Sequence, residues 1–178
     1  MSSDDGARWN SRSSGLPLFS GQPVFVNAFA VIEKKIFAGT DSGIFISSDF
    51  GANWLKSASG LTNNNVGLLE SHGTILFAGS AGIFTSSDNG SSWVVSDTDI
   101  SAHTALTGFA TNGSNVFASA WDGVYRTSDE GSTWIKTSNG LPDSTEILSI
   151  TSNGGISLAA QFMETFFFRR ITATIGIK

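Results

Sequence analysis

The sequence predicts an all-β fold made of repeated four-stranded antiparallel sheets. Three observations support this: one eight-residue motif occurs four times, short β-branched and aromatic runs surround it, and Gly, Ser, Asn and Asp separate the runs. Short apolar runs punctuated by such residues are typical of strands joined by tight turns. Self-similarity with a period of about 40 residues indicates a repeat architecture, in which each repeat is one structural unit.

The repeated motif, called the box below, reads [ST]-S-D-x-G-x-x-W. Its four copies occupy residues 2–9, 47–54, 86–93 and 127–134. The intervals between successive box tryptophans are 45, 39 and 41 residues. This near-constant interval predicts that each box occupies the same place in its repeat.

Each conserved letter of the box has a physical role in a turn between two strands. The aspartate is predicted to accept a hydrogen bond from the backbone N–H two residues on, and the glycine to adopt positive φ. The tryptophan starts the next strand and buries a large ring. The box residues predicted to be structural are Asp4, Gly6, Trp9, Asp49, Gly51, Trp54, Asp88, Gly90, Trp93, Asp129, Gly131 and Trp134.

Each complete repeat contains four predicted strands, with the box in the turn between the third and the fourth. The strands are predicted at 24–31, 35–40, 43–48 and 54–57, then 66–71, 75–80, 82–87 and 93–96, then 105–111, 115–120, 123–128 and 134–137. A further pair is predicted at 147–151 and 156–160. Four strands per repeat of this length make the blade of a β-propeller.

The predicted organisation starts with a box and an outer strand at 1–15. Blades follow at about 16–59, 60–97 and 98–139, and a partial blade at 140–160. The chain is therefore expected to be a propeller fragment of about four blades.

The tail 161–178 contains no box and breaks the pattern. Codons can be chosen for these residues so that the shifted reading frame encodes a fifth box, S-[ST]-D-N-G-N-N-W. Its tryptophan would fall at about position 175, where the spacing of the boxes predicts one. The tail is therefore expected to be out-of-frame translation, and the alternative is a divergent terminal strand. The nucleotide sequence distinguishes the two.

The box and its spacing resemble the BNR or Asp-box repeat of β-propellers, found in sialidases, sortilin-like receptors, some glycoside hydrolases and photosystem-assembly-factor-like proteins. The resemblance covers residues 2 to about 160. It implies that the remaining blades belong to a larger secreted or cell-surface protein, although this chain shows no signal peptide. Because one architecture hosts many activities, the resemblance leaves the function open.

Composition excludes several classes of function. The formal charge is −5 and no cluster of Lys and Arg is present, which argues against a nucleic-acid partner. Cysteine is absent, so neither disulfides nor thiol chemistry is expected. No apolar run of about 18 residues exists, so no membrane span is predicted. His72 and His103 share no ligand spacing, and neither a metal site nor another cofactor is expected.

The residues that catalysis would need are not recognisable. The resemblance to sialidases would require an arginine cluster, a Tyr–Glu pair and an acidic Asp, whereas Tyr125 is the only tyrosine. Tyr125 occupies the slot of Phe45 and Phe84 and is predicted to lie in the core. The loop acids Asp41, Asp99, Asp122, Asp143 and Glu146 could supply the carboxylate pair of a glycosidase. The prediction is nevertheless a protein that is not an enzyme, the alternative being a piece of a sialidase or other glycoside hydrolase that lacks its catalytic residues.

A binding surface is predicted on the face opposite the boxes, where the turn between second and third strands meets the connectors between blades. Trp121 is the one tryptophan outside the boxes, and a ring with a polar edge beside an aspartate suits a sugar or a protein. The predicted function is a non-catalytic binding or scaffold module with a glycan or protein ligand, or alternatively an assembly-factor-like propeller that binds a protein. The predicted binding residues are Asn64, His103, Trp121, Asp122, Asp143 and Glu146.

Overall fold

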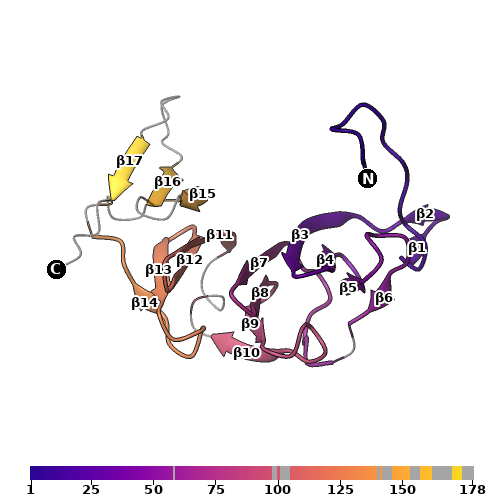
Figure 1. Cartoon of the computed structure of the whole chain (residues 1–178). Helices are drawn as coiled ribbons and strands as arrows, with labels where there is room; N and C mark the ends of the chain where they lie inside the picture. Colours follow the sequence, from indigo (N-terminus) through magenta and orange to yellow (C-terminus); the bar gives the residue numbers. More distant parts are fainter. Residues whose placement is uncertain are drawn as a thin grey trace. The chain divides into compact units, whose positions relative to one another are not determined.

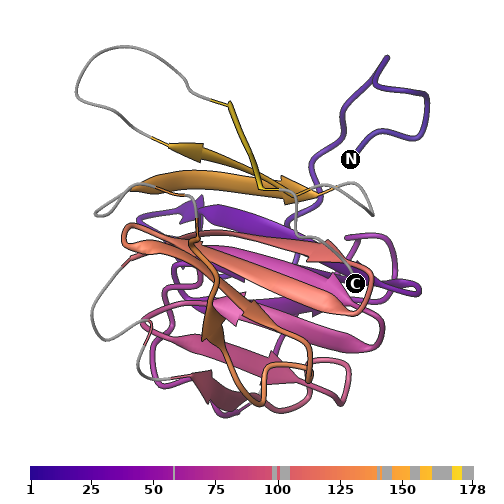
Figure 2. The same cartoon turned by 90° about the vertical axis from the view of Figure 1, so that its left-hand side faces the viewer.

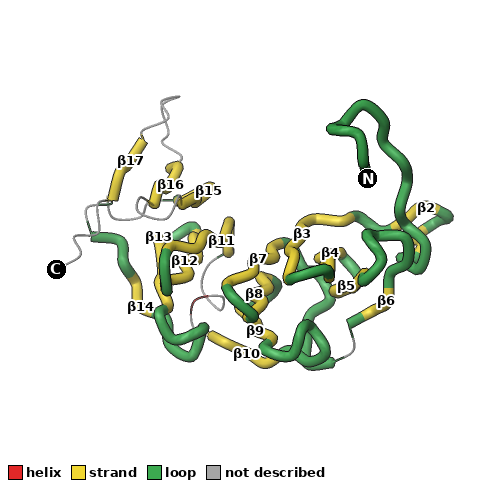
Figure 3. The backbone as a smooth tube through the Cα atoms, viewed as in Figure 1, coloured by secondary structure: helices red, strands yellow, loops and turns green. Residues whose placement is uncertain are grey.

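The chain folds into antiparallel β-sheets joined by turns. The computed structural model describes residues 1–57, 59–97, 100, 105–139, 141, 146–152, 157–161 and 170–173. Apart from helical backbone at Ile100, the regular structure of these residues is β-strand, shown in yellow in Figure 3. No helix among them is long and apolar enough to cross a membrane.

The first four-stranded sheet follows a short hairpin. The hairpin pairs β1 (Leu18–Phe19) with β2 (Gln22–Pro23), in a stretch where the sequence predicted no strand. The sheet has the order β3-β4-β5-β6, and each neighbouring pair is antiparallel. Its strands are Val26–Ile32, Lys35–Thr40, Gly43–Ser47 and Leu55–Lys56.

Two further four-stranded sheets repeat this order along the chain (Figure 1). The second contains β7 (Leu68–His72), β8 (Ile75–Gly79), β9 (Ile83–Ser86) and β10 (Val94–Asp97). The third contains β11 (Leu106–Asn112), β12 (Asn115–Ala120), β13 (Gly123–Thr127) and β14 (Ile135–Lys136). In all three sheets the box lies between the third and the fourth strand, as predicted. The fold is thus an all-β partial β-propeller of about four blades.

The last sheet has three strands, β15 (Ile147–Ser152), β16 (Ser157–Gln161) and β17 (Arg170–Ala173). β17 lies in the tail and pairs antiparallel with β16. Residues 162–169 and 174–178 of the tail lie outside the described residues. The out-of-frame interpretation of the tail stays a prediction that the gene sequence can test.

The chain divides into two compact units, residues 1–78 with 86–94 and residues 79–85 with 95–178. In the first unit the buried side chains of Ala38, Phe45 and Trp54 form one cluster of the core. The start of the second sheet packs on the first, since β3 contacts β7. A Cβ atom built on Gly39 would lie only 2.9 Å from Cγ1 of Val66, so glycine permits this close approach.

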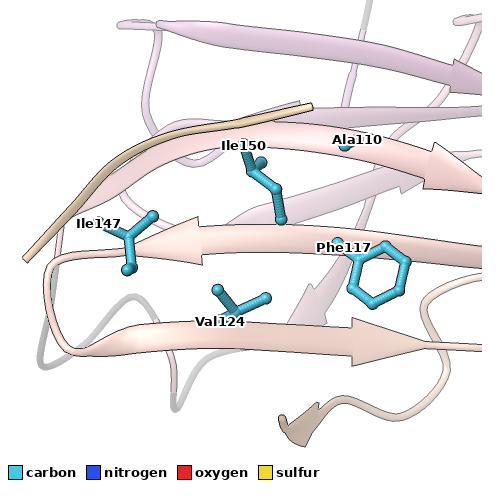
Figure 4. Packing of buried hydrophobic residues seen from close by; sticks show 5 residues of the cluster. All are labelled: Ala110, Phe117, Val124, Ile147 and Ile150. Atoms are coloured by element: carbon cyan, nitrogen blue, oxygen red, sulfur yellow. The ribbon is translucent and has the colours of Figure 1, made fainter. Parts of the chain in front are cut away.

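The core of the second unit lies between the third sheet and β15. Ala110, Phe117 and Val124 come from three neighbouring strands and pack with Ile147 and Ile150 of β15 (Figure 4). The view in Figure 2 shows the strands of the third sheet running alongside one another. Burying each of the larger side chains contributes about 1.5–3 kcal/mol, so the packing of β15 on the third sheet stabilises the second unit.

Candidate functional site

The four boxes share one pattern of hydrogen bonds. In the third box, Oδ1 of Asp88 accepts from Oγ of Ser86 at 2.8 Å and from the N–H of Ser92 at 2.8 Å. The same two contacts, from a hydroxyl two residues before and an N–H four residues after, recur at Asp4, Asp49 and Asp129. Each aspartate therefore braces its own turn.

One detail of the predicted turn is wrong. The N–H two residues after Asp88 belongs to Gly90, and it donates to Oγ of Ser86 at 2.9 Å instead of to the aspartate. Two successive residues, Asn89 and Gly90, adopt positive φ of 56° and 75°. This pair of left-handed residues turns the Gly90 N–H away from the carboxylate and toward the serine hydroxyl.

The hydrogen bonds of the box stabilise the ionised carboxylates. They hold the pKa of Asp49 at about 2, through the backbone and then the side chain of Asn53. They also hold the pKa of Asp88 and of Asp129 at about 2, mainly through the hydroxyls of Ser92 and Thr133. Groups that are ionised and engaged in this way are poor general acids. In the part of the chain that the structure describes, no group of three or more His, Cys, Asp or Glu side chains is arranged to hold a metal ion.

A cluster of polar and aromatic side chains lies at the β12–β13 turn. Trp121 and Asp122 lie in the turn, Tyr125 follows in β13, and Lys136 opposes Tyr125 in β14; the four residues are called the Trp121 cluster below. The Oδ2 of Asp122 accepts from the Tyr125 hydroxyl at 2.6 Å and from Nζ of Lys136 at 3.0 Å. The same Nζ lies 5.6 Å from the centroid of the Tyr125 ring. The Trp121 side chain is 53% exposed.

The cluster keeps Asp122 ionised. Partial burial raises the pKa of Asp122, but the hydrogen bonds from Tyr125 and Lys136 and the charge of Lys136 outweigh it, so the pKa is lowered overall. The expectation that Tyr125 lies in the core is wrong: the residue is half-buried, whereas Phe45 and Phe84 are buried. The tyrosine hydroxyl, which phenylalanine lacks, reaches the surface carboxylate.

The strand topology places three of the predicted binding residues at one end of the second unit. β11 starts at this end, the β12–β13 turn with Trp121 and Asp122 lies there, and the Trp121 N–H donates to the carbonyl of Ala105 at 3.1 Å. The hydroxyl of Thr107 donates to the carbonyl of Ile147 at 2.7 Å, so the exposed Glu146 just before it lies at this end as well. The box of this sheet lies at the opposite end.

The other predicted binding residues fall elsewhere. Asn64 lies in the first unit, where a Cβ built on Gly43 would be 3.6 Å from Oδ1 of Asn64 and 3.3 Å from Cε of Lys56. His103 and Asp143, like the loop acid Asp99, lie outside the described residues. The loop acid Asp41 accepts a hydrogen bond from Nδ2 of Asn27 at 2.8 Å.

Sequence reasoning missed two members of the cluster, Tyr125 and Lys136. A signal for them existed in the repeat. Tyr125 pairs directly with Lys136 across β13 and β14, and the equivalent pair in the first sheet is Phe45 with Lys56. Directly opposed residues share a sheet face, so aligning the fourth strands would have placed Lys136 beside Tyr125.

Comparisons with known proteins bear on the fold. No family model matches the chain, and no curated protein matches it by sequence. Among solved structures, it is similar to YCF48 bound to D1 peptide, with a TM-score of 0.62 and 14% identity over 85% of this chain and 56% of that one. It is also similar to an ancestral GH74 enzyme, with a TM-score of 0.61 and 15% identity over 85% of this chain and 22% of the enzyme.

A third similar structure is the extracellular domain of BT4673, a two-component system protein from B. thetaiotaomicron. The TM-score is 0.66 and the identity 12%, over 85% of this chain and 22% of that domain. The chain thus spans about half of one of these relatives and about a fifth of the other two. At such low identity the similarity establishes the β-propeller fold alone, and the three proteins differ in function.

Proposed function

We propose that the chain is a non-catalytic β-propeller module that binds a ligand through the Trp121 cluster. The observation that supports this most directly is the exposed side chain of Trp121, the residue just before Asp122, whose carboxylate pairs with Lys136 at 3.0 Å. A rigid aromatic surface with a few fixed polar groups is the usual make-up of a recognition site. The four boxes also support membership of the BNR or Asp-box repeat class.

The engagement of the carboxylates supports a non-catalytic role. A glycosidase of the two-carboxylate type needs an acid whose pKa is raised and a second carboxylate facing the same bond. The carboxylates of Asp49, Asp88 and Asp129 are instead held ionised by their own turns, with pKa values of about 2. Asp122 is likewise held ionised by Tyr125 and Lys136.

Secretion or display at the cell surface belongs to the proposal as well. Its support is the similarity to an extracellular domain, that of BT4673. The further blades of a larger propeller are proposed as neighbours of this chain, because it spans only 22% of that domain.

Two other functions have specific support. The similarity to an ancestral GH74 enzyme favours a piece of a glycoside hydrolase whose catalytic residues lie outside these 178 residues. The similarity to YCF48 bound to D1 peptide favours a protein-binding module related to assembly factors. Both functions are compatible with the fold. The first would make the chain part of an enzyme that cleaves a saccharide, and the second would restrict its ligand to a protein or peptide.

The test follows the indole Nε1–H resonance of Trp121 in the full chain, identified by its absence from the Trp121→Phe variant. Neutral hexasaccharides and a mixture of decapeptides serve as two separate probe sets. A shift with either set supports a binding module. Cleavage of a hexasaccharide, detected by mass spectrometry, would contradict a non-catalytic role. The absence of a shift with both probe sets would contradict binding at the cluster.

A further inference from the structure

We infer that the Trp121 cluster recognises a neutral saccharide, through a pyranose ring that carries two adjacent hydroxyl groups. The inference rests on the proposed binding function and names its ligand class. It combines an apolar stacking surface, a hydrogen-bonding pair of matching geometry, charge balance and the place of the cluster in the sheet.

The indole of Trp121 supplies the stacking surface. Its side chain is 53% exposed, and its own backbone is fixed because the Trp121 N–H donates to Ala105 at 3.1 Å. One face of a pyranose exposes several C–H groups, which pack on an aromatic ring as any apolar surface does. Because the backbone that carries the ring is already fixed, binding has to order only the side chain, which reduces the conformational entropy lost.

The ion pair supplies one acceptor next to one donor. Both bonds to Asp122 end on Oδ2, while an ionised carboxylate has about four acceptor positions on two oxygens. Lys136 uses one N–H of its ammonium group on Asp122 and has three in all. The side chains are 42% and 48% exposed, so solvent reaches them. Two adjacent hydroxyls, each both donor and acceptor, match such a pair.

Charge balance favours a neutral ligand. Lys136 and Asp122 cancel each other, and the exposed Glu146 at the same end of the unit is acidic. The chain as a whole carries a formal charge of −5. A sugar acid or a phosphorylated sugar would meet net repulsion at this surface.

The position of the cluster disfavours an extended peptide. Peptides that add a strand need an open row of backbone donors and acceptors along a sheet edge. Trp121 and Asp122 instead lie in the β12–β13 turn, where backbone groups are already used: the Trp121 N–H bonds to Ala105, and the Val124 N–H bonds to Oγ of Ser138 at 3.0 Å.

The first sheet provides an internal comparison. There the positions of Trp121, Asp122 and Tyr125 are taken by Asp41, Ser42 and Phe45, while the lysine is retained as Lys56. The first sheet therefore lacks the stacking ring, and its turn carboxylate, Asp41, stands at the position of Trp121 instead of that of Asp122. Lys56 serves as a matched control for Lys136, and the 76% exposed Trp9 as a matched control for Trp121.

The experiment titrates the ¹⁵N-labelled full chain with cellohexaose, laminarihexaose and mannohexaose. The anionic trisaccharide 3′-sialyllactose and the decapeptide mixture are run in parallel. The expected result is a shift of the Trp121 indole resonance with at least one neutral hexasaccharide. The Trp121→Ala, Asp122→Asn and Lys136→Ala variants should raise its Kd at least tenfold, while Trp9→Ala and Lys56→Ala should leave it within about twofold.

Three results would overturn the inference: a shift with decapeptides only, tighter binding of 3′-sialyllactose than of every neutral hexasaccharide, or an unchanged Kd in Trp121→Ala. A shift with decapeptides only would leave the proposed binding module standing. If no probe shifts the resonance, both the saccharide inference and the proposed binding module are contradicted. Near-ultraviolet circular dichroism of each variant verifies that the fold is retained.

Discussion

The indole Nε1 of Trp93 donates a hydrogen bond of 3.0 Å to Oγ of Ser57, a residue 36 positions earlier that directly follows β6. Oγ of Ser57 in turn donates to the carbonyl of Gly90, within the same box as Trp93. The second unit repeats this relay: Trp134 donates to Ser96 at 3.0 Å, and Ser96 to Gly131 at 2.6 Å. The box thus ties its own sheet to the outer strand of the sheet before it.

The first prediction concerns Ser57. Replacing it by alanine removes one acceptor and one donor, and leaves the buried indole N–H of Trp93 and the carbonyl of Gly90 unpaired. An unpaired buried polar group costs about 1–3 kcal/mol. The Ser57→Ala variant should therefore lose about that much free energy of unfolding, measured by urea denaturation.

A double-mutant cycle with Trp93→Phe, which removes the same indole donor, provides the control. If Ser57 acts through this bond, the two changes together should cost less than the sum of the separate costs. Additive costs would show that the contact contributes nothing of its own.

The second prediction separates the two serines that open the second box, Ser47 and Ser48. Oγ of Ser47 donates to Asp49 at 2.8 Å and accepts from the N–H of Gly51 at 2.7 Å, and the residue is buried. Ser48 is exposed. Ser47→Ala should destabilise the chain by about 1–3 kcal/mol, and Ser48→Ala by less than about 0.5 kcal/mol. Equal midpoints of urea denaturation for the two variants would contradict the assigned roles.

The third prediction is an acid-dependent loss of stability. The pKa of Asp88 is about 2 in the fold, below the ordinary value of 3.8, because hydroxyl and backbone donors of Ser92 favour its ionised form. An acid whose pKa is depressed by folding contributes stability above its unfolded value and loses it as the pH falls. The contribution of Asp88 to stability should therefore be constant above pH of about 5 and decline as the pH falls from about 4 toward 2.

The matched variant is Asp88→Asn, which removes one of the titrating groups. Its free energy of unfolding should decline less steeply than that of the wild type between pH 4 and pH 2, because one proton fewer is taken up on unfolding. Parallel declines would show that the Asp88 carboxylate is not responsible. A direct reading comes from the pH titration of its carboxyl carbon by NMR.

Much of the fold could be predicted from the sequence because the repeat is itself a physical constraint. The box requires a turn, and short apolar runs define the strands on either side. Its tryptophan is buried at Trp54 and Trp93, but Trp9 is 76% exposed, so the predicted burial of the ring is wrong for the first box. The shortest strands could not be predicted from the sequence. The hairpin of β1 and β2 has only two residues per strand and no alternation of apolar residues.

Two of the four residues of the candidate site could be predicted from the sequence, and the other two depend on the pairing register of β13 and β14. Trp121 and Asp122 stand out locally, as a lone tryptophan beside an acid in a turn. Tyr125 and Lys136 join them through strand pairing, across a box that separates the two residues along the chain. Their roles depend on which side chains oppose each other, which the composition of a segment does not reveal.

The last prediction compares two box glycines that share a backbone conformation but differ in surroundings. Gly90 has a φ of 75° and Gly6 a φ of 88°. An alanine at either place pays the cost of the left-handed conformation, about 1–2 kcal/mol. A Cβ on Gly90 would in addition lie 2.7 Å from Cε1 of the buried Phe37, whereas a Cβ on Gly6 would lie 3.9 Å from Cζ2 of Trp9.

Because Phe37 is enclosed by the core, the crowded site cannot relax freely, and overpacking adds about 1–3 kcal/mol. Gly90→Ala should therefore lower the melting temperature clearly more than Gly6→Ala, measured by calorimetry on the full chain. Equal losses would mean that the backbone conformation alone requires glycine in the box. A larger loss at Gly90 would mean that glycine is also required there because the box packs directly against the neighbouring sheet.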